Sequence, residues 1–322
     1  MQPSHDNEYV PLGNTGLSIS PIGIGTWAWG DKLFWQYGKG GFSDADLRAA
    51  FDASVEAGIN WFDTAELYGS GRSEKLLGEF VRAAGQQVLV ATKFFPYPWR
   101  LSRGALRRAL RGSLKRLGLE KTDLYQIHWP FPPRSIETWV NELANAAQAG
   151  LVRAAGVSNY NLDQTRRARE LLEARGLPLA SNQVPYSLID RKIETNGLLA
   201  YCREFNITVI AYSPLGQGVL TGKYTPDNPP PGVRGRRYNP DYLRRVQPLI
   251  GLLKEIGQAH GGKTPAQVAL NWAICKGTVP IPGAKNARQA RDNAGALGWR
   301  LTGEQVAALD KASSNVLGLS SV

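Results

Sequence analysis

The feature that most constrains the fold is a regular alternation of short apolar segments and amphipathic helical segments. Eight such pairs fill most of the 322 residues, beginning at Pro21 and ending near Leu297. Short apolar strands that alternate with amphipathic helices are typical of a parallel sheet, because the crossover helices cover its faces. Eight units in a chain of this length predict a (β/α)8 TIM barrel. A doubly wound open sheet also fits, since alternation alone does not show whether a sheet closes.

Three further segments complete the predicted architecture. Residues 8–23 place two alternating runs around Gly-Asn-Thr-Gly and predict an N-terminal β-hairpin. Two extra helices are expected, one over 249–260 and one from Thr302 to about Ala312. The Pro-, Gly- and Arg-rich residues 226–240 are expected to form a long loop after the seventh strand. No linker-like change in composition interrupts the chain, so we expect residues 1–322 to form a single barrel domain.

The charge and the termini limit the partners. The net charge of +11 favours anionic partners, which include both nucleic acids and phosphorylated cofactors. No nucleic-acid partner is expected, because the basic helical stripe at 107–116 lacks interleaved aromatic residues. The first ten residues do not resemble a signal peptide, and no apolar run is long enough to span a membrane. We therefore expect a cytoplasmic protein without a membrane partner, whose two cysteines are free thiols.

Common nucleotide and metal motifs fit the sequence poorly. "GIGTWA" at 23–28 is not followed by an amphipathic helix, so it is not a dinucleotide fingerprint. "QGVLTGKY" at 217–224 lacks the first glycine and the final Ser or Thr of a phosphate loop. The chain has three histidines, His5, His128 and His260, which are far apart in sequence. We therefore expect no metal site.

Four ionisable side chains follow consecutive predicted strands, where the active sites of barrels are built. Asp63 ends the second strand and Tyr68 lies in the loop after it, while Lys93 and His128 end the third and fourth strands. Taken singly, each has a structural explanation as a buried ion pair, a core histidine or a packed tyrosine. Gathered at one rim they would be costly to bury, so together they predict an active site.

These residue types suit proton transfer to a carbonyl oxygen. A free tyrosine has a pKa of about 10, and a neighbouring Lys93 ammonium is expected to lower it. Asp63 would keep Lys93 charged and oriented, and His128 would hydrogen-bond the same carbonyl. No serine or cysteine nucleophile is suitably placed, so the electron pair must come from elsewhere. Hydride from a nicotinamide is the natural donor.

Six stretches of the sequence together resemble the aldo-keto reductase family. They are "FDTAELYGSGRSEKLLGEF", "VATKF", "DLYQIHWP", "AAGVSNY", "AYSPLGQGVLTGKY" and "IPGAKNARQARDN", and they span nearly the whole chain. The resemblance implies NADPH-dependent reduction of aldehydes or ketones to alcohols. It assigns the catalytic tetrad to Asp63, Tyr68, Lys93 and His128, with Tyr68 as proton donor. The same family includes potassium-channel β-subunits, so a regulatory subunit that binds nicotinamide nucleotides is the alternative.

The resemblance also implies a site for NADPH/NADP+. Ser158, Asn159 and Gln183 would hold the carboxamide, Tyr212 would stack on the nicotinamide, and Thr26 and Trp27 would line the opening. Ser213, Pro214, Leu215 and Gly218 would follow the pyrophosphate. Gly283, Lys285, Gln289 and Asn293 would hold the adenosine end, with Lys285 at the 2′-phosphate and Arg288 and Arg291 as possible helpers.

The substrate pocket is predicted to be aromatic. Eight aromatic residues follow the first, third and fourth strands, namely Trp29, Phe34, Trp35, Phe95, Tyr97, Trp99, Trp129 and Phe131. They would suit an apolar or aromatic carbonyl, or a sugar or pyridine ring, although some of them could simply pack the loops. The identity of the small-molecule substrate, the direction of the reaction and the oligomeric state stay open.

Overall fold

The computed structural model describes residues 9–32, 34–38 and 41–318. The N-terminal residues on which the signal-peptide expectation rests, including His5, lie outside this part of the chain. No helix among the described residues is both long and apolar enough to cross a membrane.

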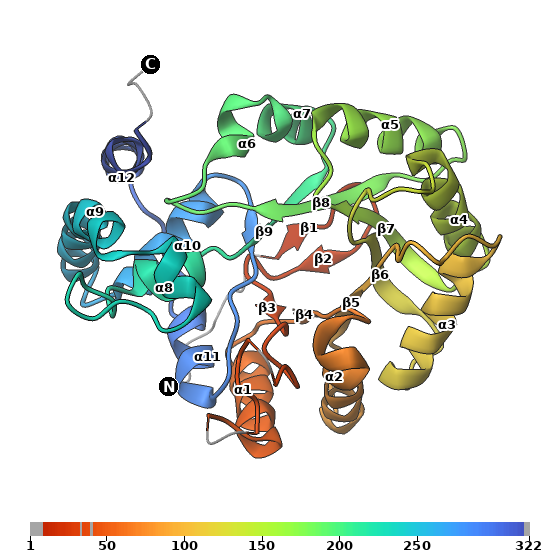
Figure 1. Cartoon of the computed structure of the whole chain (residues 1–322), viewed down its shortest axis with the longest axis horizontal. Helices are drawn as coiled ribbons and strands as arrows, with labels where there is room; N and C mark the ends of the chain where they lie inside the picture. Colours follow the sequence, from red (N-terminus) through yellow and green to blue (C-terminus); the bar gives the residue numbers. More distant parts are fainter. Residues whose placement is uncertain (1–8, 33, 39–40, 319–322) are drawn as a thin grey trace.

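The centre of the molecule is a closed parallel barrel (Figure 1). The strands are β3 (Ile24–Gly25), β4 (Trp61–Asp63), β5 (Leu89–Phe94), β6 (Thr122–Ile127), β7 (Val152–Ser158), β8 (Leu179–Pro185), β9 (Thr208–Tyr212) and β10 (Val279–Pro280). They lie in sequence order from β3 to β10. The two ends of this sheet meet, because the backbone N–H of Gly25 donates to Pro282 at 3.1 Å and Gly25 pairs with Gly283. The predicted barrel is confirmed and the open sheet is excluded.

Helices surround this barrel in Figure 1. They are α1 (Asp44–Glu56), α2 (Arg72–Ala83), α3 (Ala105–Leu117), α4 (Ile136–Gln148), α5 (Leu162–Glu173), α6 (Lys192–Thr195), α7 (Leu198–Glu204), α8 (Val233–Arg237), α9 (Pro240–Ala259), α10 (Pro265–Cys275), α11 (Ala287–Ala294) and α12 (Gly303–Leu317), with 3-10 turns η1 (Tyr68–Gly71) and η2 (Gly216–Thr221). Ser43 caps α1 in a reciprocal capping box with Asp46, as expected from its place before the helix.

The predicted hairpin closes one end of the barrel. It consists of β1 (Val10–Pro11) and β2 (Ser18–Ile19), which pair antiparallel. Leu12, Leu17 and Ile19 form one apolar cluster with inward-facing strand residues such as Trp61. Gly13 makes this docking possible, because it has φ +54° and a Cβ there would lie 2.7 Å from the carbonyl oxygen of Ala180.

Two segments differ from their expected boundaries. Helix α9 already begins at Pro240, where Asn239 caps it, and it continues through Pro248. The last helix extends to Leu317. The predicted loop over 226–240 contains the short helix α8, none of whose residues is buried. The earlier start of α9 has a proline as its reason: Pro240 is well tolerated in a first helical turn, although proline usually ends a helix.

The interior of the barrel changes character along its axis. Near the hairpin, alternate strand residues such as Leu89, Ala91 and Leu124 belong to the apolar cluster. Two residues further along the same strands stand Lys93 and Gln126, which are also buried. Because side chains two apart share one face of a strand, the apolar floor is continued by polar groups toward the carboxyl ends of the strands.

Candidate active site

A buried ion pair joins the ends of β4 and β5. The Lys93 ammonium donates to the Asp63 carboxylate, and the two side chains are 0% and 1% exposed. The ammonium also donates to the Thr64 carbonyl at 2.9 Å and to the Tyr68 hydroxyl oxygen at 3.2 Å. Burial lowers the pKa of Lys93, but the charges of Asp63 and Tyr68 outweigh it and the pKa lies above its usual value. Lys93 is therefore a fixed cation.

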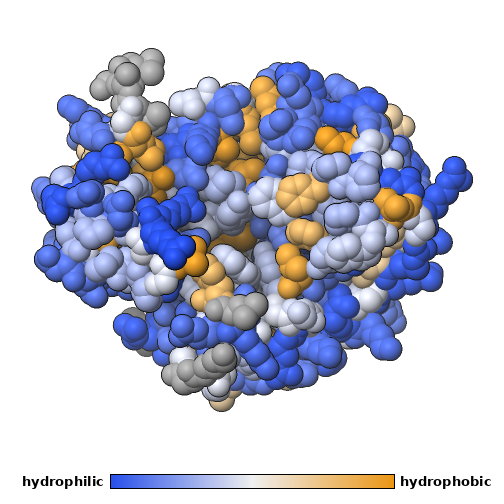
Figure 2. Space-filling model, in the orientation of Figure 1, coloured by the Kyte–Doolittle hydropathy of each residue, from blue (hydrophilic) through white to orange (hydrophobic). Residues whose placement is uncertain are grey.

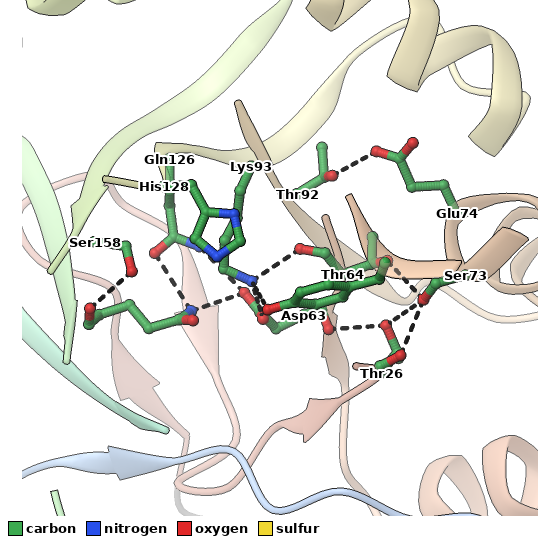
Figure 3. Close-up of polar contacts among 12 residues, drawn as sticks. Thr26, Asp63, Thr64, Ser73, Glu74, Thr92, Lys93, Gln126, His128 and Ser158 are labelled. Atoms are coloured by element: carbon green, nitrogen blue, oxygen red, sulfur yellow. Dashed lines mark hydrogen bonds and ion pairs between the residues drawn. The ribbon is translucent and has the colours of Figure 1, made fainter. Parts of the chain in front are cut away.

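Two amides hold the second oxygen of Asp63. Gln183 Nε2 donates to Oδ1 at 2.8 Å and Gln126 Nε2 donates to the same atom at 3.1 Å. Figure 3 shows Gln126 beside Asp63, Lys93 and His128. The sequence assigned Gln183 to the nicotinamide carboxamide and gave no role to Gln126. The available signal was its position two residues before His128, which puts both on one face of β6.

Tyr68 lies in η1, directly after the turn that follows β4. Burial raises the pKa of Tyr68, and the charge of Lys93, which lowers that pKa, does not offset the effect of burial. The expected influence of Lys93 is thus confirmed, but the net shift is opposite to the prediction. Since the Tyr68 oxygen accepts a hydrogen bond from Lys93, its own proton is free for another acceptor.

His128 lies next to Tyr68, and its imidazole ring is neutral. Burial and then the charge of Lys93 hold the pKa of His128 well below its usual value. Its Nδ1 is buried and has no hydrogen-bond partner within the described part of the chain. The rings of Tyr68 and Phe95 meet it edge to face at 5.9 and 5.7 Å. The imidazole is consequently able to hydrogen-bond a ligand without carrying charge.

Thr26 supports the backbone of the ion pair. Its hydroxyl donates to the Asp63 carbonyl at 3.0 Å and shares a hydrogen bond with Ser73, as Figure 3 shows. Thr26 was expected to line the opening. In the structure its side chain is fully buried and does not reach the surface there. Trp27 is 38% exposed and stacks on Phe34 at 5.1 Å.

The residues predicted to hold the nicotinamide form a second polar network. Asn159 has φ +61°, and its Nδ2 donates to the His128 carbonyl and to the Ser158 hydroxyl, both at 3.0 Å. Its Oδ1 accepts from the Tyr212 hydroxyl at 3.0 Å, and the Ser158 hydroxyl donates to the Gln183 carbonyl at 2.9 Å. The end of β7 and the end of β9 are thus tied to the strand end that carries His128.

The loop from β9 into η2 has an unusual backbone. Four of its residues have left-handed φ angles: Ser213 at +51°, Gly216 at +54°, Gln217 at +54° and Gly218 at +98°. Pro214 and Leu215 lie between them. Left-handed residues that are not glycine cost energy and concentrate at functional sites. Two of its N–H groups stabilise the loop itself, because those of Gly216 and Gly218 donate to the carbonyls of Ser213 and Leu215 at 2.9 and 3.0 Å. That the loop follows a pyrophosphate stays a prediction.

The residues predicted for the adenosine end lie between β10 and α11. Gln289 accepts from the Lys285 backbone N–H at 2.9 Å, and Asn293 donates to the Gly283 carbonyl at 3.3 Å. Burial lowers the pKa of Lys285 to about 8, together with the charges of Arg234 and Lys223. These last two residues were not predicted, since the sequence suggested Arg288 and Arg291 instead.

The predicted aromatic residues separate into three groups. Trp29 is fully buried, donates to the Ala284 carbonyl and packs on Phe80, so its assignment to the pocket was wrong. Phe34 and Trp35 contact Trp27. Around Phe95, which touches His128, lies a chain of ring contacts to Tyr97, Trp99, Phe131 and Trp129. Figure 2 shows hydrophobic residues around a hollow near the centre of this face.

Comparison with known proteins agrees with this geometry. The sequence pattern of the Aldo/keto reductase family matches residues 21–314. The chloroplastic pyridoxal reductase of Arabidopsis thaliana is 45% identical over 92% of this chain and 84% of its own length. The NADH-specific methylglyoxal reductase of Escherichia coli is 32% identical over 91% of this chain and 94% of its own.

A solved structure shows the same likeness in three dimensions. The Klebsiella pneumoniae aldo-keto reductase in complex with NADPH has a TM-score of 0.73 and 27% identity, and the match covers 94% of this chain and 93% of that one. The family pattern spans almost all of the barrel, and its relatives are oxidoreductases. The chain therefore belongs to the aldo/keto reductase family.

Proposed function

We propose that this oxidoreductase uses NADPH to reduce aldehydes or ketones to alcohols, with Tyr68 as the proton donor. The observation that carries the proposal is the hydrogen bond from the buried Lys93 ammonium to the Tyr68 hydroxyl oxygen. That bond leaves the phenolic proton for a substrate oxygen. It also places a positive charge beside the phenolate that remains after the proton has left.

Asp63 and His128 would support this step in different ways. Asp63 gives the buried Lys93 ammonium its counter-charge, and Gln126 and Gln183 hold the carboxylate in place by hydrogen bonds to Oδ1. His128 is neutral, so it would donate a hydrogen bond to the carbonyl oxygen without competing as an acid. When bound, the nicotinamide of NADPH would supply the hydride to the carbonyl carbon.

The site has three features that fit a dinucleotide phosphate. Asn159 and Tyr212 would flank the nicotinamide, and the loop over 213–218, with its left-handed residues, would follow the pyrophosphate. Lys285 precedes α11 and would meet the 2′-phosphate that distinguishes NADPH from NADH. The preference for NADPH is part of the proposal, since one relative is named as NADH-specific.

We further propose that the substrates are aromatic aldehydes. Phe95 and its neighbouring rings lie beside His128, and flat aromatic walls favour a flat aromatic ring. Pyridoxal is the first compound to test, because it combines an aldehyde with a pyridine ring and because one relative is named a pyridoxal reductase.

Steady-state oxidation of NADPH over a panel of aldehydes tests both parts. We expect turnover with aldehydes, and a higher kcat/KM for pyridoxal and benzaldehyde than for propanal. Turnover without preference for aromatic compounds would contradict the substrate class only. Tight binding of NADPH without turnover of any carbonyl would contradict the reductase and favour the regulatory subunit.

A further inference from the structure

One ion pair holds both backbone polar groups of Phe95. The Glu66 carboxylate accepts a hydrogen bond from the Phe95 N–H at 2.7 Å, and the Arg100 guanidinium donates one to the Phe95 carbonyl at 2.8 Å. Glu66 and Arg100 also bind each other twice, because Nη1 donates to Oε1 and Nη2 donates to Oε2 at 2.9 Å. A bidentate pair of planar groups fixes orientation as well as distance. The pair therefore sets the position of the Phe95 backbone.

The same pair joins two segments that reach the catalytic rim. Glu66 lies in the turn after β4, two residues before Tyr68, whereas Phe95 and Arg100 lie in the segment that leads from β5 to α3 (Figure 1). The ring of Phe95 meets His128 edge to face at 5.7 Å, and the ring of Tyr68 does so at 5.9 Å. The pair thus ties the loop of the proposed proton donor to the aromatic ring that contacts His128.

The segment over 95–101 has a hollow beside it. The backbone hydrogen bonds that Tyr97, Arg100 and Leu101 donate end within the segment itself. Trp99 and Arg100 line a hollow of about 370 Å³ that also borders α3. The residues of α3 that line it include three without large side chains, Ala105, Ala109 and Gly112. Because small side chains give little support, we infer that the ion pair is the main anchor of this segment.

Arg100 also fixes the rings that the segment carries. Its Cζ lies 4.9 Å from the centre of the Phe94 ring and 5.0 Å from the centre of the Tyr97 ring. Tyr97 in turn contacts the Phe95 ring at 4.6 Å and stacks on Trp99 at 4.5 Å. A guanidinium over an aromatic face is attracted by the negative charge density of that face. One side chain therefore orders both the backbone and the rings of the segment.

A second pair of the same residue types has different surroundings. Arg116 donates to Glu74 at 2.6 Å, and Glu74 accepts from the Thr92 hydroxyl at 2.6 Å. The arginine and glutamate side chains are 27% and 0% exposed in this pair, against 21% and 8% for Arg100 and Glu66. This second pair joins α2, β5 and α3, which form the wall of the barrel. Its similar burial makes it a matched control.

We propose that Arg100 is a specificity-determining positioning residue, which acts with Glu66 to hold the Phe95 ring against the ring of an aromatic aldehyde. The inference deepens the proposed function and rests on it. Contact between two aromatic rings depends on their separation and angle, so it weakens when one ring is displaced. Contact with an aliphatic chain has no such directional requirement. Loss of the pair should therefore affect aromatic aldehydes selectively.

Steady-state kinetics of the full-length protein with NADPH, benzaldehyde and propanal test this assignment. Arg100→Lys keeps the positive charge but loses the planar fork that binds both Glu66 and Phe95. The KM for benzaldehyde should rise by about two- to tenfold, the scale of one aromatic contact, while kcat and both constants for propanal stay near those of the wild type. Glu66→Gln should act in the same direction, because its neutral amide binds the guanidinium more weakly.

Two further variants separate positioning from stability. Arg116→Lys changes the control pair, so it should alter the stability of the fold but leave the ratio of kcat/KM between the two aldehydes unchanged. Phe95→Leu should lower that ratio by itself. If Arg100 acts through Phe95, adding Arg100→Lys to Phe95→Leu should lower the ratio no further, since two changes in one contact are not additive.

The results that would overturn the inference are distinguishable. If wild type prefers benzaldehyde but Arg100→Lys changes the ratio no more than Arg116→Lys, or impairs both aldehydes alike, Arg100 has only a structural role and the reductase proposal stands. Additive effects of Arg100→Lys and Phe95→Leu would show that Arg100 does not act through Phe95. If wild type reduces aldehydes without preferring aromatic ones, the substrate class fails together with the inference. If wild type reduces no carbonyl compound, the proposed function fails as well.

Discussion

The Asp63–Lys93 pair and the group formed by Lys223, Arg234 and Lys285 are both built from charged side chains, but the protein supplies a counter-charge only to the first. At the strand ends, the Lys93 ammonium faces the Asp63 carboxylate, and two amides satisfy the remaining oxygen. At the end of the site predicted to hold adenosine, Lys285 faces Arg234 and Lys223, and no carboxylate is paired with them among the described residues.

The two regions therefore differ in how their charges affect the stability of the free protein. The ion pair is complete in the free protein, so removing one partner should damage folding as well as chemistry. The cations have no carboxylate partner among the described residues, so removing one should relieve repulsion in the free protein and weaken binding of the proposed anionic ligand.

The largest effect is expected from Lys93→Met. It leaves Asp63 as a buried carboxylate without a counter-charge, and breaking a buried pair from one side costs about 3 to 5 kcal/mol. Chemical denaturation should therefore show a large loss of stability together with lost reductase activity. Lys115→Met on the exposed side of α3 is the control and should change neither.

Adding Asp63→Asn to Lys93→Met separates the pair from the chemistry. The double variant should regain much of the lost stability, because the uncompensated charge is gone, but no activity. Equal stability of the single and double variants would show that the two residues are not coupled.

Tyr68→Phe should affect chemistry alone. The hydroxyl makes one hydrogen bond to Lys93 and none that holds the backbone, so folding should change little. Carbonyl reduction should fall by about two orders of magnitude or more, the usual scale of general acid catalysis. NADPH affinity, measured by quenching of tryptophan fluorescence, should stay near that of the wild type. Near-normal turnover would remove Tyr68 from the role of proton donor.

The smallest effect is a pH dependence of NADPH binding. Lys285 has a pKa of about 8 in the free protein, and a phosphate beside it would favour the charged form and raise that pKa. The stabilising charge is present below pH 8, and above pH 8 binding requires uptake of a proton. The dissociation constant of NADPH should rise by about tenfold from pH 7 to pH 9.

NADH supplies the internal control for this titration, since it lacks the 2′-phosphate and its dissociation constant should stay nearly flat. In Lys285→Ala the NADPH curve should also flatten, and NADPH binding at pH 7 should be weaker by about ten- to a hundredfold. A parallel rise for both nucleotides in the wild type would exclude Lys285 as the cause.

Much of the fold could be predicted from the sequence, because the patterns that indicate it lie within short stretches of the chain. Strand and helix periodicity, helix caps such as Ser43, and the hairpin glycines depend on residues near in sequence, and they predicted the order of the barrel elements. The strand ends with Asp63, Lys93 and His128 followed from the same periodicity. Because parallel strands end at one rim, their convergence was predicted without coordinates.

The failures concern contacts that no local pattern encodes. Trp29 was predicted to line the pocket as a loop aromatic. Its indole N–H instead donates to the carbonyl oxygen of Ala284, which lies 255 residues later in the chain. The net shift in the pKa of Tyr68 depends on its burial, which the sequence does not quantify. The sequence likewise could not show that Gln126 and Gln183, from two strands, meet on one oxygen of Asp63.

The sequence by itself thus determined the barrel, the family and the four residues that meet at one rim, because each depends on periodicity or on a short motif. Only the tertiary structure decided which cations stand together at the other end of the site. Arg234 belongs to a segment that reads as a loop, and Trp35 follows the first strand. Both reach Lys285 only when the barrel closes and brings the loops after β3, β9 and β10 side by side.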